Sequence, residues 1–233
     1  MDLDGALWQV WKAMDVPEGF RAEVIGEAVE LSPTEGVRHF TVNRRLHGSL
    51  LDHLGGTGRG PASGGNVIHG LNVLVPDVFV APDDLAEFGD PDGFGVLASG
   101  VAPVAETVSP GSERRKRDLV RKHRAYATAG IPIYVIIDDF DDGGSVTVLS
   151  GPDPVRGSYA SSVRTPYGEE AIIPEGPAKG FVIGPDITGG PRCDRRRPKS
   201  PCSRRPGRGG FDPCPTMRTA AHAGWRTSSA RAG

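Results

Sequence analysis

Cysteine is absent from the first 192 residues of this 233-residue chain, and the three cysteines, Cys193, Cys202 and Cys214, all follow. Most of the chain therefore has neither a disulfide framework nor a thiolate for catalysis. The three cysteines are also too far apart for a zinc module, in which cysteines come in pairs about two to four residues apart.

Long apolar runs are missing as well, since none approaches the roughly 20 residues that a membrane-spanning helix needs. Residues 1–20, MDLDGALWQVWKAMDVPEGF, lack the basic stretch and following apolar stretch of a secretory signal. We therefore expect a cytoplasmic protein with no membrane partner. The stretch GGTGRGPASGG lacks the Gly-Lys-Ser/Thr ending of a phosphate-binding loop, so it predicts a flexible loop without a nucleotide role.

The charge is unevenly distributed. The formal net charge is −2, but residues 190–233 carry +9 and residues 1–189 carry −11. The C-terminal segment is rich in Arg, Pro and Gly and poor in core-forming residues, so it cannot bury enough apolar surface to offset its ordering entropy. We predict a disordered basic tail over residues 186–233. A shifted reading frame would also produce so abrupt a change, and such a tail would suit nonspecific contact with phosphates.

Periodicity in the remaining chain predicts a mixed α/β domain around one sheet. A short N-terminal helix occupies residues 1–16, and the main domain spans residues 17–185. Helices are expected over residues 3–14, 37–54 and 112–129, and strands over 20–33 (a hairpin), 66–70, 73–83, 101–109, 131–138, 144–152, 157–163 and 170–173. The apolar side of the second helix is expected to comprise Val37, Phe40, Val42, Leu46, Leu50, Leu51 and Leu54.

Four polar residues, Glu23, Asp77, Glu106 and Lys122, stand at positions where core residues are expected. Asp77 interrupts VLVPDVFV, Glu106 interrupts VAPVAETVS, and Glu23 lies between two apolar residues of the first strand. Lys122 falls on the apolar stripe of its helix. Buried carboxylates that lie near one another repel unless a cation sits between them.

A divalent cation would make this arrangement reasonable. Mg²⁺ (or Mn²⁺) prefers oxygen ligands, and Mg²⁺ is usually held by one or two carboxylates together with water. A lysine beside the cation could orient or deprotonate a water, or neutralise charge on a phosphorane-like transition state. The chemistry implied is metal-assisted hydrolysis of a phosphodiester.

The segments RAEVIGEAVELSP, VPDVFV and VAETVSPGSERRKRDLVRKHRAYATAGIPIYVIID resemble the Uma-type restriction endonucleases, a domain of unknown function within the PD-(D/E)XK nuclease superfamily. The resemblance covers about residues 17–185. It implies a restriction-endonuclease-like fold, with a mixed β-sheet flanked by helices. It also implies a divalent metal, Mg²⁺ or Mn²⁺, and endonuclease activity on DNA. Nucleases of this fold often dimerise, so a homodimer is an expected assembly.

Carried over by position, the resemblance implies that Asp77 and Glu106 are the metal ligands. The catalytic residues would be Glu23, Asp77, Glu106 and Lys122, with Asp118 and Tyr126 in support at four-residue steps on either side of Lys122.

The lysine departs from the standard superfamily pattern, in which it stands two residues after the glutamate. That position is Val108 here. The Uma-type proteins supply the lysine from the following helix, and Lys122 matches that position. A lysine missing from the strand favours a second interpretation, in which a nuclease fold without catalysis binds nucleic acid or a protein partner.

Each candidate also has an ordinary structural interpretation. Asp77 follows a proline, as turn residues often do. Glu106 fits a strand-end partner of an arginine, and Glu23 fits an exposed hairpin carboxylate. Asp118 and Lys122 are four residues apart, the spacing of a surface ion pair on a helix.

Two further groups bear on function. His39, His47 and His53 lie on the helix 37–54, but their spacing is not that of a helical pair of metal ligands, so we assign them no metal role. A position facing the site stays open for His39, which lies near the start of this helix. Seven basic residues of the helix 112–129 predict a surface that steers a phosphate backbone. They are Arg114, Arg115, Lys116, Arg117, Arg121, Lys122 and Arg124.

Overall fold

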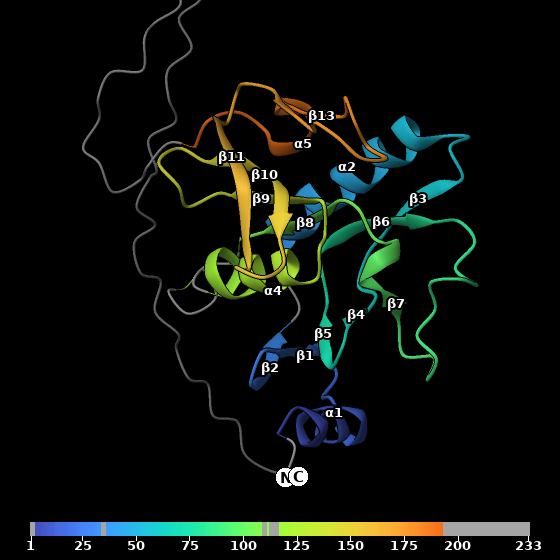
Figure 1. Cartoon of the computed structure of the whole chain (residues 1–233). Coiled ribbons are helices and arrows are strands. Elements are labelled where there is room, and N and C mark those ends of the chain that lie inside the picture. The colour runs from blue at the N-terminus through green and yellow to red at the C-terminus, as the bar shows by residue number, and fades with distance from the viewer. Residues whose placement is uncertain (1–2, 34–35, 109–110, 112–116, 193–233) are drawn as a thin grey trace, which may run out of the picture. The chain divides into compact units, whose positions relative to one another are not determined.

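The computed structural model describes residues 3–33, 36–108, 111 and 117–192. The predicted mixed α/β class is confirmed, but the strands form two main sheets instead of one (Figure 1). The five-stranded sheet has the order β2 (Ala28–Pro33), β1 (Phe20–Ile25), β5 (Asn72–Leu74), β4 (Val67–His69) and β7 (Val96–Leu97). The six-stranded sheet has the order β11 (Ser158–Pro166), β10 (Ser145–Asp153), β9 (Ile133–Asp138), β8 (Val104–Thr107), β6 (Val78–Pro82) and β3 (Arg59–Ala62).

The helices and short elements complete the described chain. Helix α1 (Leu3–Ala13) and helix α2 (Val37–Leu54) lie within one residue of their predicted bounds. A 3-10 turn, η1 (Ala98–Gly100), follows β7. A π-helical turn, η2 (Arg117–Lys122), runs directly into α4 (His123–Thr128). A two-stranded sheet of β12 (Ala171–Ile172) and β13 (Val182–Ile183) precedes α5 (Pro185–Thr188).

The central strands of the six-stranded sheet, β6, β8 and β9, are buried on both faces. Side chains alternate along a strand, so Val78 and Val80 of β6 pack in one core with α2, while Phe79 and Ala81 pack in another core with Tyr126 of α4. Burying each side chain of this size contributes roughly 1.5–3 kcal/mol. Such a two-sided sheet gives near-continuous apolar runs in the sequence, which is why a single charged residue within a run is conspicuous.

Helix α2 buries a narrower stripe than predicted. Val42, Leu46, Leu50 and Leu54 repeat at four-residue steps and are all buried. The prediction was wrong for three apolar residues, which lie on the exposed part of the helix: Val37, Phe40 and Leu51 are 84%, 65% and 56% exposed. The reason is geometric. Residues at four-residue steps lie on one side of a helix, so these four side chains already cover the sheet, and the other apolar residues point away from it.

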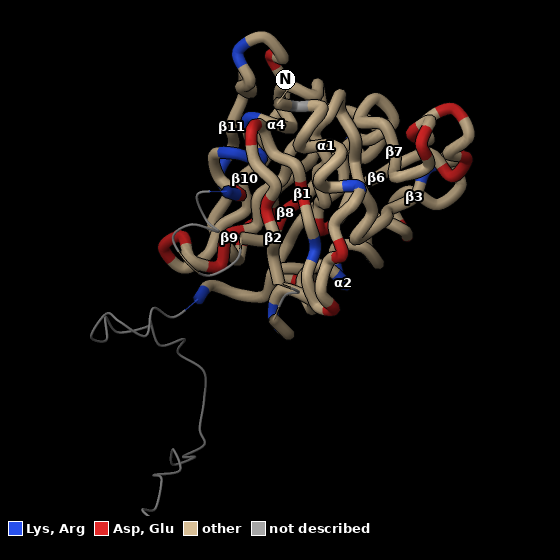
Figure 2. Tube along the Cα trace, turned by 90° about the horizontal axis from the view of Figure 1, so that it is seen from below, with Lys and Arg blue, Asp and Glu red and all other residues tan. Residues whose placement is uncertain are grey.

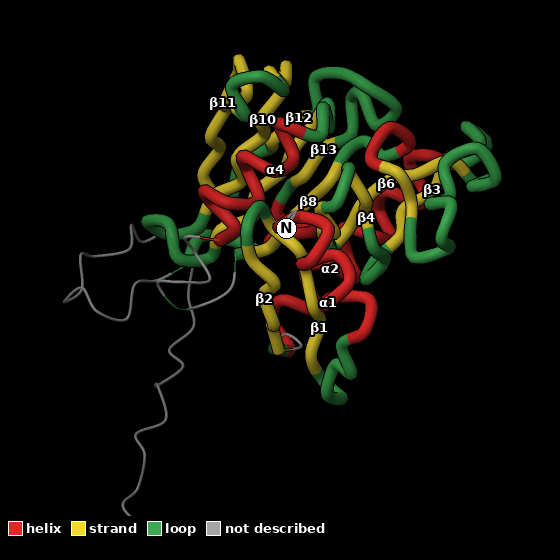
Figure 3. Tube along the Cα trace, turned by 60° about the horizontal axis from the view of Figure 1, so that its bottom comes forward, coloured by secondary structure: helices red, strands yellow, loops and turns green. Residues whose placement is uncertain are grey.

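Helix α1 covers the five-stranded sheet (Figure 3). Trp8 packs with Val24, Ile68 and Val73 in a small core of its own. The indole nitrogen of Trp11 donates a hydrogen bond of 3.0 Å to the carbonyl of Ala22. The amphipathic pattern at the N-terminus thus produces a helix anchored to β1.

The segment Val75–Pro76–Asp77 carries the chain from one sheet to the other, since β5 ends at Leu74 and β6 begins at Val78. A proline has no N–H for the ladder, which favours a break between strands at this point. Because β6 pairs with β8 antiparallel and Val78 faces Ala105, Asp77 emerges beside Glu106. We use the term sheet crossover for residues 75–77 below.

Two sequence predictions fail at the edges of the fold. The glycine-rich stretch predicted as a flexible loop contains β3, which pairs antiparallel with β6. The predicted tail begins at residue 186, but Ile187 of α5 is buried in the main core, so the folded part continues beyond that point. Residues 193–233 of the predicted tail and residues 112–116 of the predicted helix lie outside the described residues.

None of the described helices combines the length and the apolar character that a bilayer span requires.

Acidic residues gather in the loop between β6 and β7, next to β3 (Figure 2). Residues 1–189 carry a net charge of −11, so any contact with nucleic acid is expected to be local.

Candidate active site

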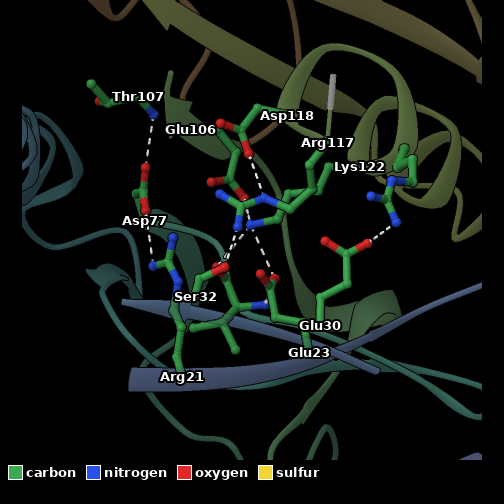
Figure 4. A network of polar contacts seen from close by, with 12 residues as sticks. Arg21, Glu23, Glu30, Ser32, Asp77, Glu106, Thr107, Arg117, Asp118 and Lys122 are labelled. Atoms are coloured by element: carbon green, nitrogen blue, oxygen red, sulfur yellow. Dashed lines mark hydrogen bonds and ion pairs between the residues drawn. The ribbon is translucent and has the colours of Figure 1, made fainter. Parts of the chain in front are cut away.

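Lys122 is the centre of the candidate site. It is the last residue of η2, and its side chain is fully buried. Its ammonium group lies 2.7 Å from Oε1 of Glu106 and 3.0 Å from Oε1 of Glu23 (Figure 4). A third contact is a hydrogen bond of 3.2 Å to the carbonyl oxygen of Val75 in the sheet crossover. The lysine thus joins the two sheets at one point.

Glu106 lies on β8 with 1% exposure, on the same face of the strand as Val104. Its Oε1 accepts hydrogen bonds from Lys122 and from the hydroxyl of Tyr126, the latter at 2.6 Å. The Tyr126 ring is itself buried against Tyr134, with ring centroids 4.9 Å apart. Tyr126, predicted as a supporting residue, therefore contacts Glu106 directly.

Glu23 comes from β1 in the other sheet and is fully buried. Its Oε1 accepts a hydrogen bond of 2.7 Å from the backbone N–H of Val75, in addition to the contact with Lys122. Among the described residues, its Oε2 has no hydrogen-bond partner. A buried carboxylate oxygen without a partner is costly, so it marks a place for a cation or a water.

Asp77 lies at the end of the sheet crossover and is 5% exposed. Its Oδ2 accepts hydrogen bonds from Nε2 of His39 at 2.7 Å and from the backbone N–H of Thr107 at 2.8 Å. Its Oδ1 lies 3.1 Å from a guanidinium nitrogen of Arg21. The bond to Thr107 fixes the carboxylate beside the strand that carries Glu106.

His39 is a further residue of this site, although its sequence spacing indicates no metal role. No second histidine lies four residues from His39 on α2. Its hydrogen-bond partner is instead Asp77, 38 residues away on another element. The signal available in the sequence is its spacing, since His39 precedes Val42 by three residues and so falls on the same side of α2 as the residues that pack on the sheet. His39 contacts one carboxylate oxygen of Asp77 and Arg21 contacts the other.

A second set of ion pairs surrounds the lysine and corrects two expectations. Asp118 and Lys122 do not form a surface pair, because both are buried and Asp118 binds Nε of Arg117 at 2.9 Å. Arg117 also contacts Ser32, and Arg121 pairs with Glu30. The predicted basic steering surface is therefore wrong for Arg117 and Lys122, which are buried, whereas the Arg121 side chain stays 39% exposed beside Glu30.

The electrostatics of the site follow from two carboxylates that share one ammonium group. Burial raises the pKa of Glu106 to about 8, an effect that Lys122 opposes and that Asp77, Asp118 and Glu23 reinforce. Burial alone would lower the pKa of Lys122, but the charges of Glu106 and Glu23 raise it above its ordinary value. The lysine keeps its proton, whereas Glu106 holds its negative charge poorly without a further cation.

Asp77 behaves in the opposite way. Burial would raise its pKa, but the hydrogen bond and charge of His39, together with Arg21 and Lys122, hold the pKa well below its usual range. Asp77 is therefore a permanent anion next to a glutamate that titrates near neutrality. Pairs of acids whose pKa values are pushed apart in this way are typical of functional sites.

The residues fit a divalent cation in their chemistry. Asp77, Glu106 and Glu23 supply hard oxygen ligands, and the unpartnered Oε2 of Glu23 and the raised pKa of Glu106 both indicate that positive charge is in short supply. Within the described ranges no three acidic, histidine or cysteine side chains converge as a ready-made cage. Mg²⁺ does not require such a cage, because it is usually bound through one or two carboxylates and several waters.

Comparison with known proteins places this site in a family. The Uma2 family, described as "Putative restriction endonuclease", matches residues 8–185. The chain belongs to the Uma2 family. A crystal structure of a "putative nuclease belonging to DUF820" from Anabaena variabilis ATCC 29413 matches with a TM-score of 0.59 and 13% identity, over 78% of this chain and 97% of that chain. No curated protein matches the chain.

The solved structure shows the fold, and the family match supports a nuclease of the restriction-endonuclease type. The matched residues include every side chain of the site, from Glu23 on β1 to Lys122 on η2. As a Uma2 protein the chain carries Val108, which is buried, at the position of the usual superfamily lysine, while Lys122 approaches Glu106 from the helical side.

Proposed function

We propose that this protein is a divalent-metal-dependent endonuclease that hydrolyses phosphodiester bonds of DNA. The observation that carries the proposal is the fully buried Lys122, held between Glu23 and Glu106 beside Asp77. A merely structural core would not require these charges, because apolar residues of similar volume serve as well or better. The family of the chain points to the same chemistry.

The roles follow from charge and position. Asp77 and Glu106 would hold Mg²⁺ or Mn²⁺, with Glu23 assisting through its unpartnered Oε2. When bound, such an ion polarises a phosphoryl oxygen and lowers the pKa of a coordinated water. Lys122 fixes Glu23 and Glu106 and adds positive charge near the reacting phosphate. Its raised pKa makes it a cation rather than a general base.

Calorimetric titration of the full chain with Mg²⁺ and Mn²⁺ tests the proposal. We expect binding in the wild-type protein and none in Glu106→Gln, because the amide keeps the shape of the side chain but removes the ligand charge. The apo fold should tolerate this change, since an uncharged side chain at position 106 is what the raised pKa already favours.

Glu27→Gln is the matched control, as this carboxylate lies exposed in the turn between β1 and β2. It should bind the metal like the wild type. Equal binding in Glu106→Gln and in the wild type would contradict the assignment of Glu106 as a ligand. Loss of binding in both variants would mean that the effect reports overall charge.

The affinity for the metal should depend on pH with a defined sign. Because the pKa of Glu106 is raised to about 8, protons compete with the metal below that pH. Affinity should rise as the pH increases from 6 to 8, by up to roughly tenfold per unit, and level off above it. Calorimetry in buffers of different ionisation enthalpy would show a proton released on binding. A flat profile would show that Glu106 is already ionised.

A binding module without catalysis is the second candidate function. The observation that favours it is that both oxygens of Asp77 already have protein partners, namely His39, Thr107 and Arg21. For Asp77 to hold a metal, Arg21 has to release Oδ1. A protein that binds nucleic acid but takes up neither Mg²⁺ nor Mn²⁺ would support this function over the first.

A further inference from the structure

An open pocket of about 490 Å³ lies directly beside Asp77. One wall is a face of α2, on which the lining residues repeat at helical spacing. The opposite side includes Arg21, the ion-pair partner of Asp77. The lining residues that matter here are Arg21, Phe40, Asn43, Arg44, His47 and Asp77.

Phe40 is unusual among these residues because its ring is 65% exposed. Its neighbour one turn further along the helix, Arg44, is also exposed. Packing does not require an aromatic ring here, since α2 contacts the sheet through other positions. An exposed aromatic ring next to cationic side chains is the composition of a surface on which nucleobases stack.

The pocket continues on the other side of Arg21. A second pocket of about 290 Å³ is lined by Arg21 together with Lys12, Trp11 and Phe20, and it also shares Gly64 with the first. The Phe20 ring is 46% exposed. We call these two adjoining pockets the Arg21 groove. The groove has an exposed aromatic ring on each side of a central guanidinium group.

We propose that the Arg21 groove binds a single strand of nucleic acid, with a base stacked on Phe40 and phosphates held by Arg44 and Arg21. This inference rests on the proposed nuclease function and specifies its substrate class as unpaired strands, such as overhangs, flaps or loops. The central guanidinium lies 3.1 Å from Asp77, so a phosphate that it binds is adjacent to the carboxylate assigned to the metal.

The preference for a single strand has a physical reason. In a duplex the face of each base is covered by its neighbours, so an aromatic side chain reaches it only when the strand is unpaired or the base is displaced. Charge points the same way. Residues 1–189 are acidic overall, and two cations of the groove, Arg21 and Lys12, already pair with Asp77 and Asp92. The few cations of the groove therefore suit a few phosphates of one strand better than the two backbones of a duplex.

Fluorescence anisotropy with a labelled 12-nucleotide oligothymidylate and a labelled 12-base-pair duplex, both in EDTA, tests the inference. The full chain should bind the single strand more tightly. Phe40→Ala should weaken that binding by about 5- to 100-fold, the range measured for loss of one base–aromatic stack, and should leave duplex binding unchanged. Arg44→Ala should weaken binding and reduce its salt dependence by about one phosphate contact.

Val37→Ala is the matched control, because this residue is 84% exposed on the same helix and lines neither pocket. It should bind the oligothymidylate like the wild type. Equal affinity of Phe40→Ala and the wild type for the single strand would overturn the inference, as would tighter binding of the duplex. A change of oligomeric state in Phe40→Ala, measured by light scattering, would also overturn it and assign the ring to an interface between copies.

The two proposals fail in different ways. Phe40→Ala should bind Mg²⁺ in calorimetry as the wild type does, because the Phe40 ring supplies no ligand atom for a cation. If the wild type takes up no metal but binds the single strand in a Phe40-dependent manner, the nuclease proposal fails and the groove stands. If metal binding depends on Glu106 but binding of the single strand is the same in Phe40→Ala and the wild type, the proposal for the Arg21 groove is contradicted and the nuclease proposal is not.

Discussion

Replacement of Lys122 by methionine is expected to lower the free energy of unfolding by about 3–5 kcal/mol and to abolish phosphodiester cleavage. Methionine has a similar length, so the loss reflects charge more than volume. The change leaves Oε1 of Glu23 and Oε1 of Glu106 without their shared cation, and the carbonyl of Val75 without its donor. Urea unfolding and cleavage of labelled DNA in Mg²⁺ measure the two effects.

A second variant separates stability from activity. Without Lys122, Glu106 has to take up a proton or remain a buried unpaired charge; adding Glu106→Gln removes this cost, so it should recover at least about 1 kcal/mol of stability while activity stays absent. Lys179→Met, at an exposed position, is the control and should change neither quantity. If Lys122→Met is as stable as the wild type, the lysine is not the partner on which the buried carboxylates depend.

Asp77→Asn is expected to reduce cleavage by about a thousandfold or more while the protein remains folded, because loss of a proposed metal ligand would remove several kcal/mol of transition-state stabilisation. The amide matches the carboxylate in shape and can still accept a hydrogen bond from Thr107. It cannot replace the negative charge, which the low pKa of Asp77 keeps in place at every physiological pH. Single-turnover cleavage with saturating Mg²⁺ measures the effect.

Asp141→Asn provides the matched control for this prediction. Asp141 also pairs with an arginine, Arg164 at 2.5 Å, and with the hydroxyl of Ser145 at 2.6 Å, but it lies in the turn after β9. Its loss should leave cleavage within about twofold of the wild type. Comparable activity losses in the two variants would attribute the role of Asp77 to general stability and not to chemistry.

The residues of the site could be predicted largely because they violate a pattern. Asp77 and Glu106 stand in stretches that are buried throughout, and Lys122 stands on the buried stripe of its helix with Tyr126, so each charge requires a partner. Glu23 followed from its position in the first strand. The structure brings these residues together, while their catalytic role stays a prediction. The sequence pattern does not predict which of these side chains contact one another, such as the shared contact of Glu23 and Glu106 with Lys122.

His39 and Arg117 could not be assigned by such local reasoning. The partner of His39 lies on the sheet crossover, and only tertiary contact reveals it. Arg117 stands in a run of basic residues that is typical of a solvated helix, yet its guanidinium is buried against Asp118 and Ser32. Sequence spacing describes neighbours on one element, and both of these residues depend on partners elsewhere in the fold.

The fold was predictable to the extent that it is periodic. Helix α2 and the hairpin of β1 and β2 follow from apolar spacing and from Gly26, whose φ of +62° is natural for glycine. Strand β3 has no apolar alternation, and it exists because β6 offers it hydrogen-bond partners. The two-sheet arrangement was missed because Pro76–Asp77 reads as an interruption of one strand, whereas it separates strands of different sheets.

The sheet crossover has a consequence for how the molecule opens. Glu23 on β1 and Glu106 on β8 belong to different sheets, yet both carboxylates contact the ammonium group of Lys122. In the sheet crossover, the backbone N–H of Val75 donates a hydrogen bond to Glu23, and its carbonyl accepts one from Lys122. A fluctuation that parts the sheets at this seam therefore breaks the ion cluster as well. Backbone amides on either side of the seam should exchange with solvent as one cooperative unit. Thermal motion that opens this seam would thus inactivate the protein before it unfolds.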